Sequence, residues 1–288
     1  MRKSNIDKIR ELHEQYPQLC HASNILNKYE DNDKIPQLTK IVKKYIVYLT
    51  ENLKLVGFTD AIIKKRVSML NDYYNFIHNN NYDNLYKSQG KFRPTILEEF
   101  LFLLFKDFVE QYQTKLNAQD HLDSGSVKAY SNLYFKATNF EEFIQNPDMA
   151  VNVKDQDFAI YRKFTLTVNN SKTVNLQVPA LAIEAKTYID KTMLDGIIAT
   201  AEKIKSGNPY SMFISVAETY DVALGVDPAY SRIDQIYVLR KTSPKILRTE
   251  WKDINTEVVL KMFKEVKEHL ERPWSDVRTR LINDGVII

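Results

Sequence analysis

Two acidic residues and a lysine, spaced along two predicted strands, are the residues of this chain best suited to chemistry. The first strand runs from Asp157 to Val168, and the second runs from Thr173 to Lys186. The polar residues 169–172 lie between the two strands and are typical of a hairpin turn. An acidic residue, Glu184, stands two positions before the end of the second strand. The hairpin therefore carries charged groups at the end remote from its turn.

The register of this hairpin decides which groups meet. A symmetric hairpin centred on Asn170 and Ser171 places Asp157 directly across from Glu184, with Cβ atoms about 5 Å apart. Side chains alternate along a strand, so Glu184 and Lys186 lie on the same face. We therefore expect three ionisable groups to converge at one place.

The expected pair of opposed carboxylates suggests a metal site. Like charges that face each other on a sheet are unfavourable unless something lies between them. Carboxylate oxygens suit Mg²⁺, and a neighbouring lysine can stabilise negative charge or help position or deprotonate a water. That combination is the equipment for metal-assisted phosphodiester hydrolysis. The alternative is a hairpin with solvated acids and a surface lysine, because the pattern is short and common.

The residues around the hairpin favour the functional interpretation. The apolar run Val178–Ile183 predicts a buried strand that leads into the acid and the lysine. A helix follows, which Thr192 can cap and which ends at Gly207, and residues 210–217 predict another apolar strand. Together they form a β–α–β unit. The end of a buried strand before such a crossover is a usual place for an active site.

Upstream, Thr95 and Glu98 have the spacing of a capping box at the start of a helix. Either Glu98 or its neighbour Glu99 could lean toward the metal site; the alternatives are a capping role for the first and an exposed helix face for the second. Residues 131–137 are consistent with a strand. The expected order from Thr95 to residue 217 is helix, three strands, helix and strand. Residues 256–270 predict an amphipathic helix that packs against the sheet.

This order, with an acid at the start of the second strand and Glu-x-Lys at the end of the third, resembles the PD-(D/E)xK nuclease fold. The sequence also resembles the BbvCI type of type II restriction endonuclease over roughly residues 93–270. The stretches that carry this resemblance are Arg93–Phe100, Lys154–Phe158, Val178–Lys186, Met193–Lys203 and Ile233–Arg240. The resemblance implies Mg²⁺-dependent cleavage of a short duplex DNA sequence by a dimer in the prokaryotic cytoplasm. Some members of that group pair two different but related subunits, so a homodimer and a heterodimer both stay open.

The resemblance also implies roles for individual residues. Asp157 and Glu184 match the metal-binding acids of the family, and Lys186 matches its catalytic lysine. Gln156 stands where the family's eponymous proline would be, and that proline is commonly absent. Asp155 competes for the role of first acid, although the register above pairs it with Lys186. A bulge in the hairpin would reopen that choice.

The composition excludes several other classes of protein. A single cysteine, Cys20, excludes a disulfide scaffold within the monomer and suggests a reducing, cytosolic setting. The first residues lack the apolar core of a signal peptide, and no uncharged apolar run is long enough to span a membrane. The five histidines are scattered, so no pair has metal-ligand spacing on one helix. The sequence contains no Gly-rich phosphate loop, which argues against a nucleotide cofactor.

The first third of the chain is basic and is predicted to be helical. Residues 1–93 hold 16 Lys and Arg against 10 Asp and Glu, a net charge of +6, whereas the remainder carries −3. Helices are expected over residues 6–16, 38–55 and 59–78. Among the basic residues of the last two helices, Arg66 included, the candidates for DNA-backbone contact are Lys43, Lys44, Lys64 and Lys65. The alternative for each is an ordinary solvated position.

The sequence thus predicts a mixed α/β protein. An N-terminal helical domain (residues 1–90) precedes a nuclease domain (residues 91–288), whose mixed sheet is flanked by helices. The boundary between the two domains is expected between residues 79 and 92. The expected activity is Mg²⁺-dependent hydrolysis of duplex DNA. Two rivals are a catalytically idle DNA-binding subunit with the same fold and a helical interaction protein.

Overall fold

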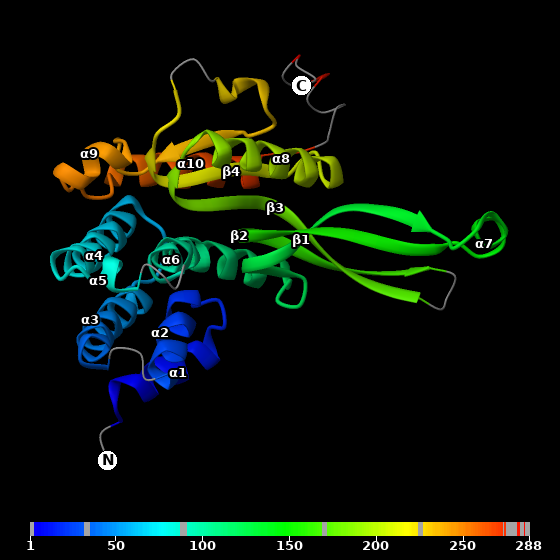
Figure 1. Cartoon of the computed structure of the whole chain (residues 1–288). Helices are drawn as coiled ribbons and strands as arrows, with labels where there is room; N and C mark the ends of the chain where they lie inside the picture. Colours follow the sequence, from blue (N-terminus) through cyan, green and yellow to red (C-terminus); the bar gives the residue numbers. More distant parts are fainter. Residues whose placement is uncertain are drawn as a thin grey trace.

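The computed structural model describes residues 3–31, 35–86, 91–168, 172–223, 227–272, 274, 281, 282 and 285. Figure 1 shows a sheet with helices on both sides and a group of helices from the N-terminal third beside it. The N-terminal and central elements are α1 (Asn5–Gln15), α2 (Cys20–Glu30), α3 (Ile35–Lys54), α4 (Asp60–Asn79), α5 (Tyr82–Leu85), α6 (Phe92–Leu116), β1 (Leu122–Lys136), α7 (Phe140–Gln145) and β2 (Asp148–Val168). The later elements are β3 (Lys172–Ile189), α8 (Lys191–Gly207), β4 (Met212–Tyr220), β5 (Gln235–Val238), α9 (Pro244–Thr249) and α10 (Thr256–Glu271).

The described strands form one mixed sheet, as the sequence predicts. Its order is β1-β2-β3-β4-β5. The strands β1, β2 and β3 pair antiparallel, whereas β3, β4 and β5 pair parallel. The helix α8 connects the parallel neighbours β3 and β4, so the predicted β–α–β unit is confirmed.

Alternating side chains of β3 give the sheet two apolar faces. Leu181 and Ile183 pack with α6 and α10 on one face, whereas Ala182 packs with α8 on the other. The ring of Phe105 on α6 stacks between Phe158 of β2 and Phe263 of α10, with centroids 5.7 Å and 5.2 Å away. The predicted helix at residues 256–270 therefore packs against the sheet and α6 together.

Helix α8 approaches β1 so closely that its last residue has to be glycine. A Cβ atom on Gly207 would lie 2.1 Å from the backbone oxygen of Ser131. The Ser131 hydroxyl also donates a hydrogen bond to the backbone oxygen of Lys203 on α8, at 3.2 Å. The glycine that ends the predicted helix thus also permits the contact between helix and sheet.

The N-terminal helices pack around α6 and share a core with the sheet. The predicted helices at 6–16, 38–55 and 59–78 are confirmed as α1, α3 and α4, whereas α2 was not predicted. One apolar cluster runs from α1 to α4 through α6 into the sheet and α10. The division of the chain at residue 90 stays a prediction, since residues 87–90 lie outside the described residues.

Several predicted boundaries are wrong. Strand β1 begins at Leu122, well before residue 131, and the short helix α7 follows it. Asp190, rather than Thr192, caps α8, because its side chain accepts a hydrogen bond from the backbone N–H of Met193 at 2.8 Å. Asp190 lies two residues before Thr192, and from there its carboxylate reaches the free backbone N–H groups of the first turn of α8.

The capping box at Thr95 is also wrong. Helix α6 begins at Phe92, so Thr95 lies inside its first turn. The Thr95 hydroxyl donates to the backbone oxygen of Phe92 at 3.0 Å and lies 2.8 Å from Nδ1 of His21. The Thr95 hydroxyl therefore contacts His21 of α2 instead of capping the helix as the local pattern predicts.

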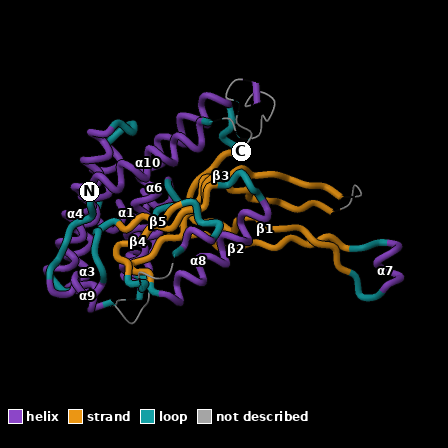
Figure 2. The backbone as a smooth tube through the Cα atoms, turned by 90° about the horizontal axis from the view of Figure 1, so that it is seen from above, coloured by secondary structure: helices purple, strands orange, loops and turns teal. Residues whose placement is uncertain are grey.

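Two arms extend from the sheet beyond the helices. The first arm (residues 132–153) comprises the end of β1, α7 and the start of β2, and the second arm (residues 162–178) comprises the end of β2 and the start of β3. Figures 1 and 2 show both arms on the same side of the molecule. Within the described residues, no helix has the length and apolar character needed to cross a membrane.

Candidate active site

The pairing of β2 with β3 sets the geometry of the site. Phe158 pairs with Ile183 next to the predicted acids, so the expected register is present there. Near the turn it is wrong by one residue, because Val168 pairs with Lys172. A register shift between Ile160 and the next pair absorbs the difference. The bulge thus restores the register that the symmetric hairpin predicts, and the turn residues 169–171 lie outside the described residues.

The structure brings Asp157, Glu184 and Lys186 together. The ammonium of Lys186 lies 2.7 Å from Oε1 of Glu184 and 3.3 Å from Oδ2 of Asp157. The backbone N–H of Ala185 donates to the same Asp157 oxygen at 2.8 Å, which fixes this carboxylate against β3. The hydroxyl of Ser215 on β4 donates to the backbone oxygen of Glu184 at 3.2 Å. Strands on both sides therefore hold the site in place.

The charges at this site do not balance. Two carboxylates face one ammonium, and the side chains of Asp157, Glu184 and Lys186 remain 29%, 17% and 28% exposed. Burial and the charge of Asp157 raise the pKa of Glu184. Burial alone would lower the pKa of Lys186, but the two carboxylates outweigh it and raise this pKa, so the amine is an ammonium at neutral pH. The site has an excess of negative charge and is open to solvent.

Asp155 lies away from these three groups. It pairs across the sheet with Lys128 of β1, and its side chain is exposed. Between the two aspartates, the buried Gln156 donates to the backbone oxygen of Asp155 at 2.7 Å. The structure therefore places only Asp157 of the two competing acids beside Lys186.

The adjacent glutamates Glu98 and Glu99 face different parts of the molecule. Burial and the nearby charge of Asp157 raise the pKa of Glu98 to about 7, whereas the neighbouring Cys20 thiol opposes this rise. The fully buried carboxylate of Glu99 accepts hydrogen bonds from the backbone N–H groups of His21 and Ala22 at 2.9 and 3.0 Å. It therefore caps α2, and Glu98 is the one within the electrostatic reach of the site.

The donor set at the site fits Mg²⁺. Among the described residues, no three His, Cys, Asp or Glu side chains are gathered closely enough to form a complete protein cage for a metal. Mg²⁺ typically binds through one or two carboxylates and keeps several waters. Asp157 and Glu184 provide two such carboxylates in a position that solvent can reach.

A second charged cluster, which the sequence analysis did not identify, lies on the neighbouring strand β4. Glu218 is fully buried and accepts hydrogen bonds from Arg93 on α6 at 3.0 and 2.8 Å and from Arg240 at 2.8 Å. Burial alone would raise the pKa of Glu218, but the two guanidinium groups lower it to about 2. The Arg240 guanidinium also lies 4.3 Å from the ring centre of Trp251. The sequence signal was present, because Glu218 ends an apolar strand as Glu184 does.

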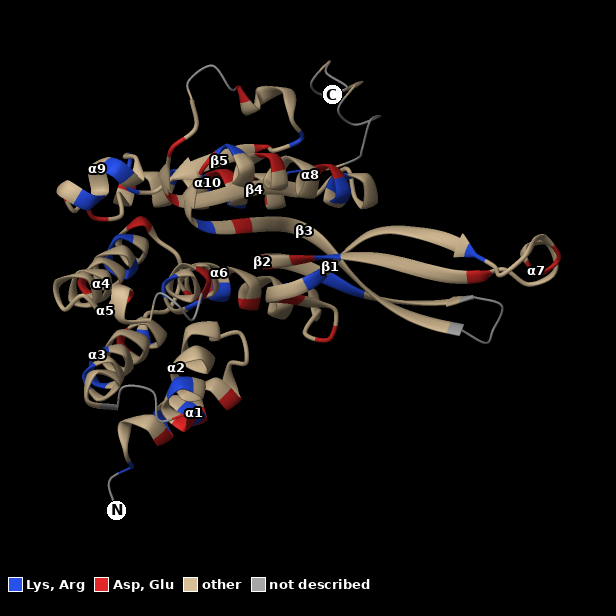
Figure 3. Ribbon diagram, in the orientation of Figure 1, with Lys and Arg blue, Asp and Glu red and all other residues tan. Residues whose placement is uncertain are grey.

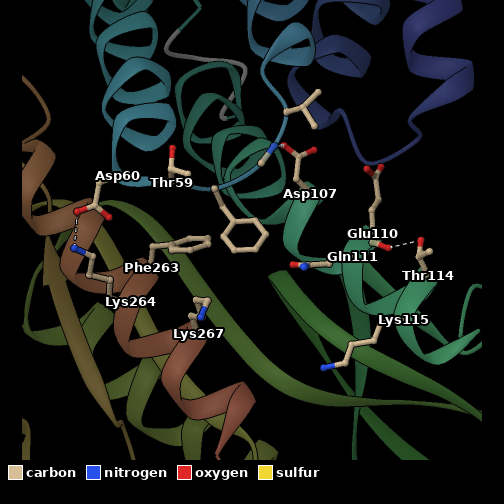
Figure 4. A pocket seen from close by; sticks show the side chains of 13 residues that line it. Thr59, Asp60, Asp107, Glu110, Gln111, Thr114, Lys115, Phe263, Lys264 and Lys267 are labelled. Carbon is tan, nitrogen blue, oxygen red and sulfur yellow. Dashed lines mark hydrogen bonds and ion pairs between the residues drawn. The ribbon is translucent and has the colours of Figure 1, made fainter.

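Two hollows lie near α4 and α6. A cleft of about 480 Å³ borders the chain just beyond Lys186, with Thr187, Tyr188 and Arg248 among its lining residues. A larger hollow of about 1040 Å³, shown in Figure 4, lies where α4, α6 and α10 meet. None of the three site residues lines the larger hollow, and its Lys264 already pairs with Asp60 at 2.6 Å. None of the three site residues lines the smaller cleft either.

Three of the four candidate DNA-backbone lysines are exposed, and Lys44 is partly buried. Lys64 lies 3.9 Å from the exposed Glu257. Figure 3 shows that the basic residues of α3 and α4 are interspersed with acidic ones. Arg66 does not belong to a phosphate-binding surface, because it is buried and pairs with Asp107 at 2.9 Å.

Comparisons with known proteins agree with this fold. The sequence profile of the Bpu10I restriction endonuclease family matches residues 89–284. The chain is similar in structure to a protein described as "native BbvCI A2B2 tetramer at low resolution", with a TM-score of 0.66 and 20% sequence identity. That similarity covers 88% of this chain and 95% of the other. No curated protein matches the sequence.

Proposed function

Because the chain belongs to the Bpu10I restriction endonuclease family, we propose that it is a type II enzyme that hydrolyses duplex DNA at a specific sequence with Mg²⁺ as cofactor. The observation that carries this proposal is the convergence of Asp157, Glu184 and Lys186 at the solvent-accessible end of the hairpin. Metal, carboxylates and a cationic group are the equipment for phosphodiester hydrolysis.

Each of the three residues has a distinct role in this proposal. Asp157 and Glu184 would hold the metal, and the Ala185 N–H fixes the orientation of the Asp157 carboxylate. When bound, Mg²⁺ polarises the phosphate and lowers the pKa of a bound water. The Lys186 ammonium orients the attacking water and stabilises the negative charge that develops on the phosphate. Its raised pKa supports the charged form in this role.

The proposal includes an assembly of at least two subunits. The structural neighbour's description names a tetramer of two kinds of chain, which supports multimeric assembly for this fold. One site of this kind cleaves one phosphodiester bond, so two subunits are needed to cut both strands at once. A homodimer and a heterodimer with a related subunit are both compatible with this requirement.

A plasmid cleavage assay tests the activity directly. We expect cleavage with Mg²⁺ and none with excess EDTA. We expect specific binding without turnover with Ca²⁺, because its looser coordination positions the water poorly. Run-off sequencing of the cut ends identifies the recognition sequence and the cut positions. Undiminished cleavage in EDTA would remove the metal from the mechanism.

The same assay separates the rival functions. Specific DNA binding without cleavage in Mg²⁺ indicates a catalytically idle subunit with this fold. No DNA binding under any of these conditions indicates an interaction protein. Because the chain can require a related subunit, a negative result counts only after the chain has been mixed with any partner that copurifies with it.

A further inference from the structure

The two arms carry an unusual share of the exposed apolar surface. Eighteen large hydrophobic side chains are exposed among the described residues, and eight of them lie in the arms. These eight are Tyr134, Phe135, Phe140, Phe143, Ile144, Val153, Phe164 and Leu166. An aromatic side chain has roughly 150–250 Å² of surface, so this set exposes several hundred Å². Exposed apolar surface that is concentrated in this way is a feature of interaction sites.

The tip of the first arm is an amphipathic helix with nothing over its apolar stripe. Phe140, Phe143 and Ile144 of α7 lie on one helix face, at positions i, i+3 and i+4. Their exposed fractions are 78%, 49% and 65%, and α7 has no buried residue. A helix of six residues has little stability of its own, so this stripe is best explained by packing against another surface.

The second arm is a two-stranded ribbon with one apolar face and one polar face. Phe164 pairs with Leu176, and Leu166 pairs with Val174, so these side chains share a face. On the opposite face, the Thr165 hydroxyl lies 3.1 Å from Oδ1 of Asn175. An isolated two-stranded ribbon is marginally stable in water. The Arg162 guanidinium lies 4.8 Å from the ring centre of Phe164, but Phe164 and Leu166 remain 42% and 37% exposed. This face can therefore pack against a further surface.

The arms have opposite charges. The first arm contains one Lys and three acidic residues, a net charge of −2, whereas the second contains three Lys or Arg and no acid, a net charge of +3. Glu141 is exposed at the tip of the first arm, and Arg162 is exposed at the base of the second. The negative charge of the first arm disfavours DNA as its partner, because phosphates repel carboxylates. It favours the second arm of another copy.

The arms also have a geometry suited to reciprocal exchange. They extend on the same side of the molecule (Figures 1 and 2), so a two-fold axis can place each first arm against the second arm of the other copy. At roughly 3.3 Å per residue, Phe164 lies about 23 Å along β2 from Asp157. The proposed contact therefore does not include the three site residues.

We propose that the two arms form a self-association surface, on which the first arm of one copy of this chain packs against the second arm of another. The stripe of α7 lies against the apolar ribbon face around Phe164, and Glu141 lies near Arg162. Each contact occurs twice in the dimer. This inference does not depend on DNA cleavage.

Sedimentation velocity on the purified full chain, from roughly 1 to 100 µM, tests the surface. We expect the wild-type chain to dimerise. A triple variant with Phe140→Ser, Phe143→Ser and Ile144→Ser should raise the dissociation constant by about 100-fold or more. The matched control carries Val56→Ser and Tyr230→Ser, which remove side chains that are 80% and 96% exposed outside the arms. Circular dichroism confirms that both proteins are folded.

Charge reversal identifies the arms as each other's partner. Glu141→Lys and Arg162→Glu should each weaken the dimer, because like charges then face each other twice. An equimolar mixture of the two variants should recover the wild-type dissociation constant, because both contacts in the mixed dimer again join opposite charges. A monomeric wild-type chain, a triple variant that associates like the wild type, or a mixture no tighter than its components would each overturn the proposal.

Discussion

Two neighbouring strands end in an acid, and the two acids have opposite environments. Glu218 on β4 is fully buried, and one carboxylate faces two guanidinium groups that use both of its oxygens. On β3, Glu184 shares one ammonium with Asp157, and all three side chains remain partly exposed. The first cluster is balanced, because Arg93 also pairs with Asp83 at 3.2 Å, whereas the second has an excess of negative charge.

This difference separates a structural cluster from a candidate catalytic one. The Glu218 cluster joins α6, β4 and the segment after β5, and its acid has no position left for a ligand. The Asp157 and Glu184 pair has one cation fewer than it has carboxylates and is accessible to solvent, so it can accept a metal ion. The sequence pattern, an acid that ends an apolar strand, is the same in both. The number and type of counter-charges distinguish them.

The largest expected effect is on cleavage. Asp157→Ala, Glu184→Ala and Lys186→Ala should each reduce the cleavage rate by roughly a thousandfold or more, because each removes a group that acts on the metal or the water. For the two acid variants, the free energy of unfolding in urea should change by less than about 1 kcal/mol, since removing either acid also relieves repulsion. Asp155→Ala is the control and should retain most of the activity. If Asp155→Ala were inactive and Asp157→Ala were active, the metal-binding acid would be Asp155 and not Asp157.

The second prediction concerns the buried cluster. Glu218→Gln leaves Arg240 without an acidic partner and Arg93 with Asp83 alone, and removing one partner of a buried ion pair typically costs about 3–5 kcal/mol. We expect this loss in the free energy of unfolding measured with urea. Glu250→Gln, at a side chain that is 69% exposed, should change it by less than about 0.5 kcal/mol. A loss below about 1 kcal/mol for Glu218→Gln would show that the arginines do not depend on this acid.

A third prediction uses pH to examine Glu99, a buried acid without a cationic partner. Burial raises its pKa to about 7 from an ordinary value of 4.5, although its hydrogen bonds oppose the rise. The folded protein thus holds this proton more tightly than the unfolded chain. The resulting stabilisation is complete below pH 4.5 and is lost as the pH rises through about 7.

Glu99→Gln removes this titration and keeps an oxygen acceptor for the α2 amides. The stability of the variant relative to the wild type should therefore rise between pH 4.5 and 7.5 by on the order of 1–3 kcal/mol. Urea unfolding at several pH values measures the difference, to which Glu98 contributes equally in both proteins. A constant difference across this range would contradict the raised pKa of Glu99.

A smaller effect is expected for Glu98, whose charge lies near the candidate metal site. At pH 8, Glu98 is ionised because its pKa is about 7, so Glu98→Gln should raise the Mg²⁺ concentration for half-maximal cleavage by about three- to tenfold. The effect should largely disappear at pH 6, where the wild-type carboxyl is protonated. Glu99→Gln is the matched control, because this neighbour faces α2. An equal effect of both variants would indicate a change in α6 and not in the local charge.

The features that the sequence predicted are those set by local periodicity. The apolar run before Glu184 and the helix after it were sufficient to predict the β–α–β unit, because burial imposes period 2 on strands and period 3.6 on helices. The orientation of Glu98 and Glu99 could not be predicted, because it depends on α2, which lies almost 80 residues earlier in the chain. Glu218 was missed for the same reason, because Arg93 comes from a helix 125 residues away. Short-range pattern identifies the acids, whereas long-range packing sets their environments.

The smallest expected effect concerns lysines that belong to neither cluster. Lys43, Lys44, Lys64 and Lys65 lie on α3 and α4, and residues 1–93 carry a net charge of +6. If these lysines contact phosphates, replacing all four with glutamine should weaken specific and non-specific DNA binding alike. The slope of log K against log salt should fall by about 0.9 for each lost contact. The cut sequence should stay the same, because phosphate contacts position the protein and base contacts specify the site.

Fluorescence anisotropy at several salt concentrations measures the slope, with Lys261→Gln and Lys267→Gln on α10 as a control for the loss of exposed cations. An unchanged slope in the quadruple variant would assign these lysines to a solvated helix face and leave the DNA contacts to the nuclease part of the chain.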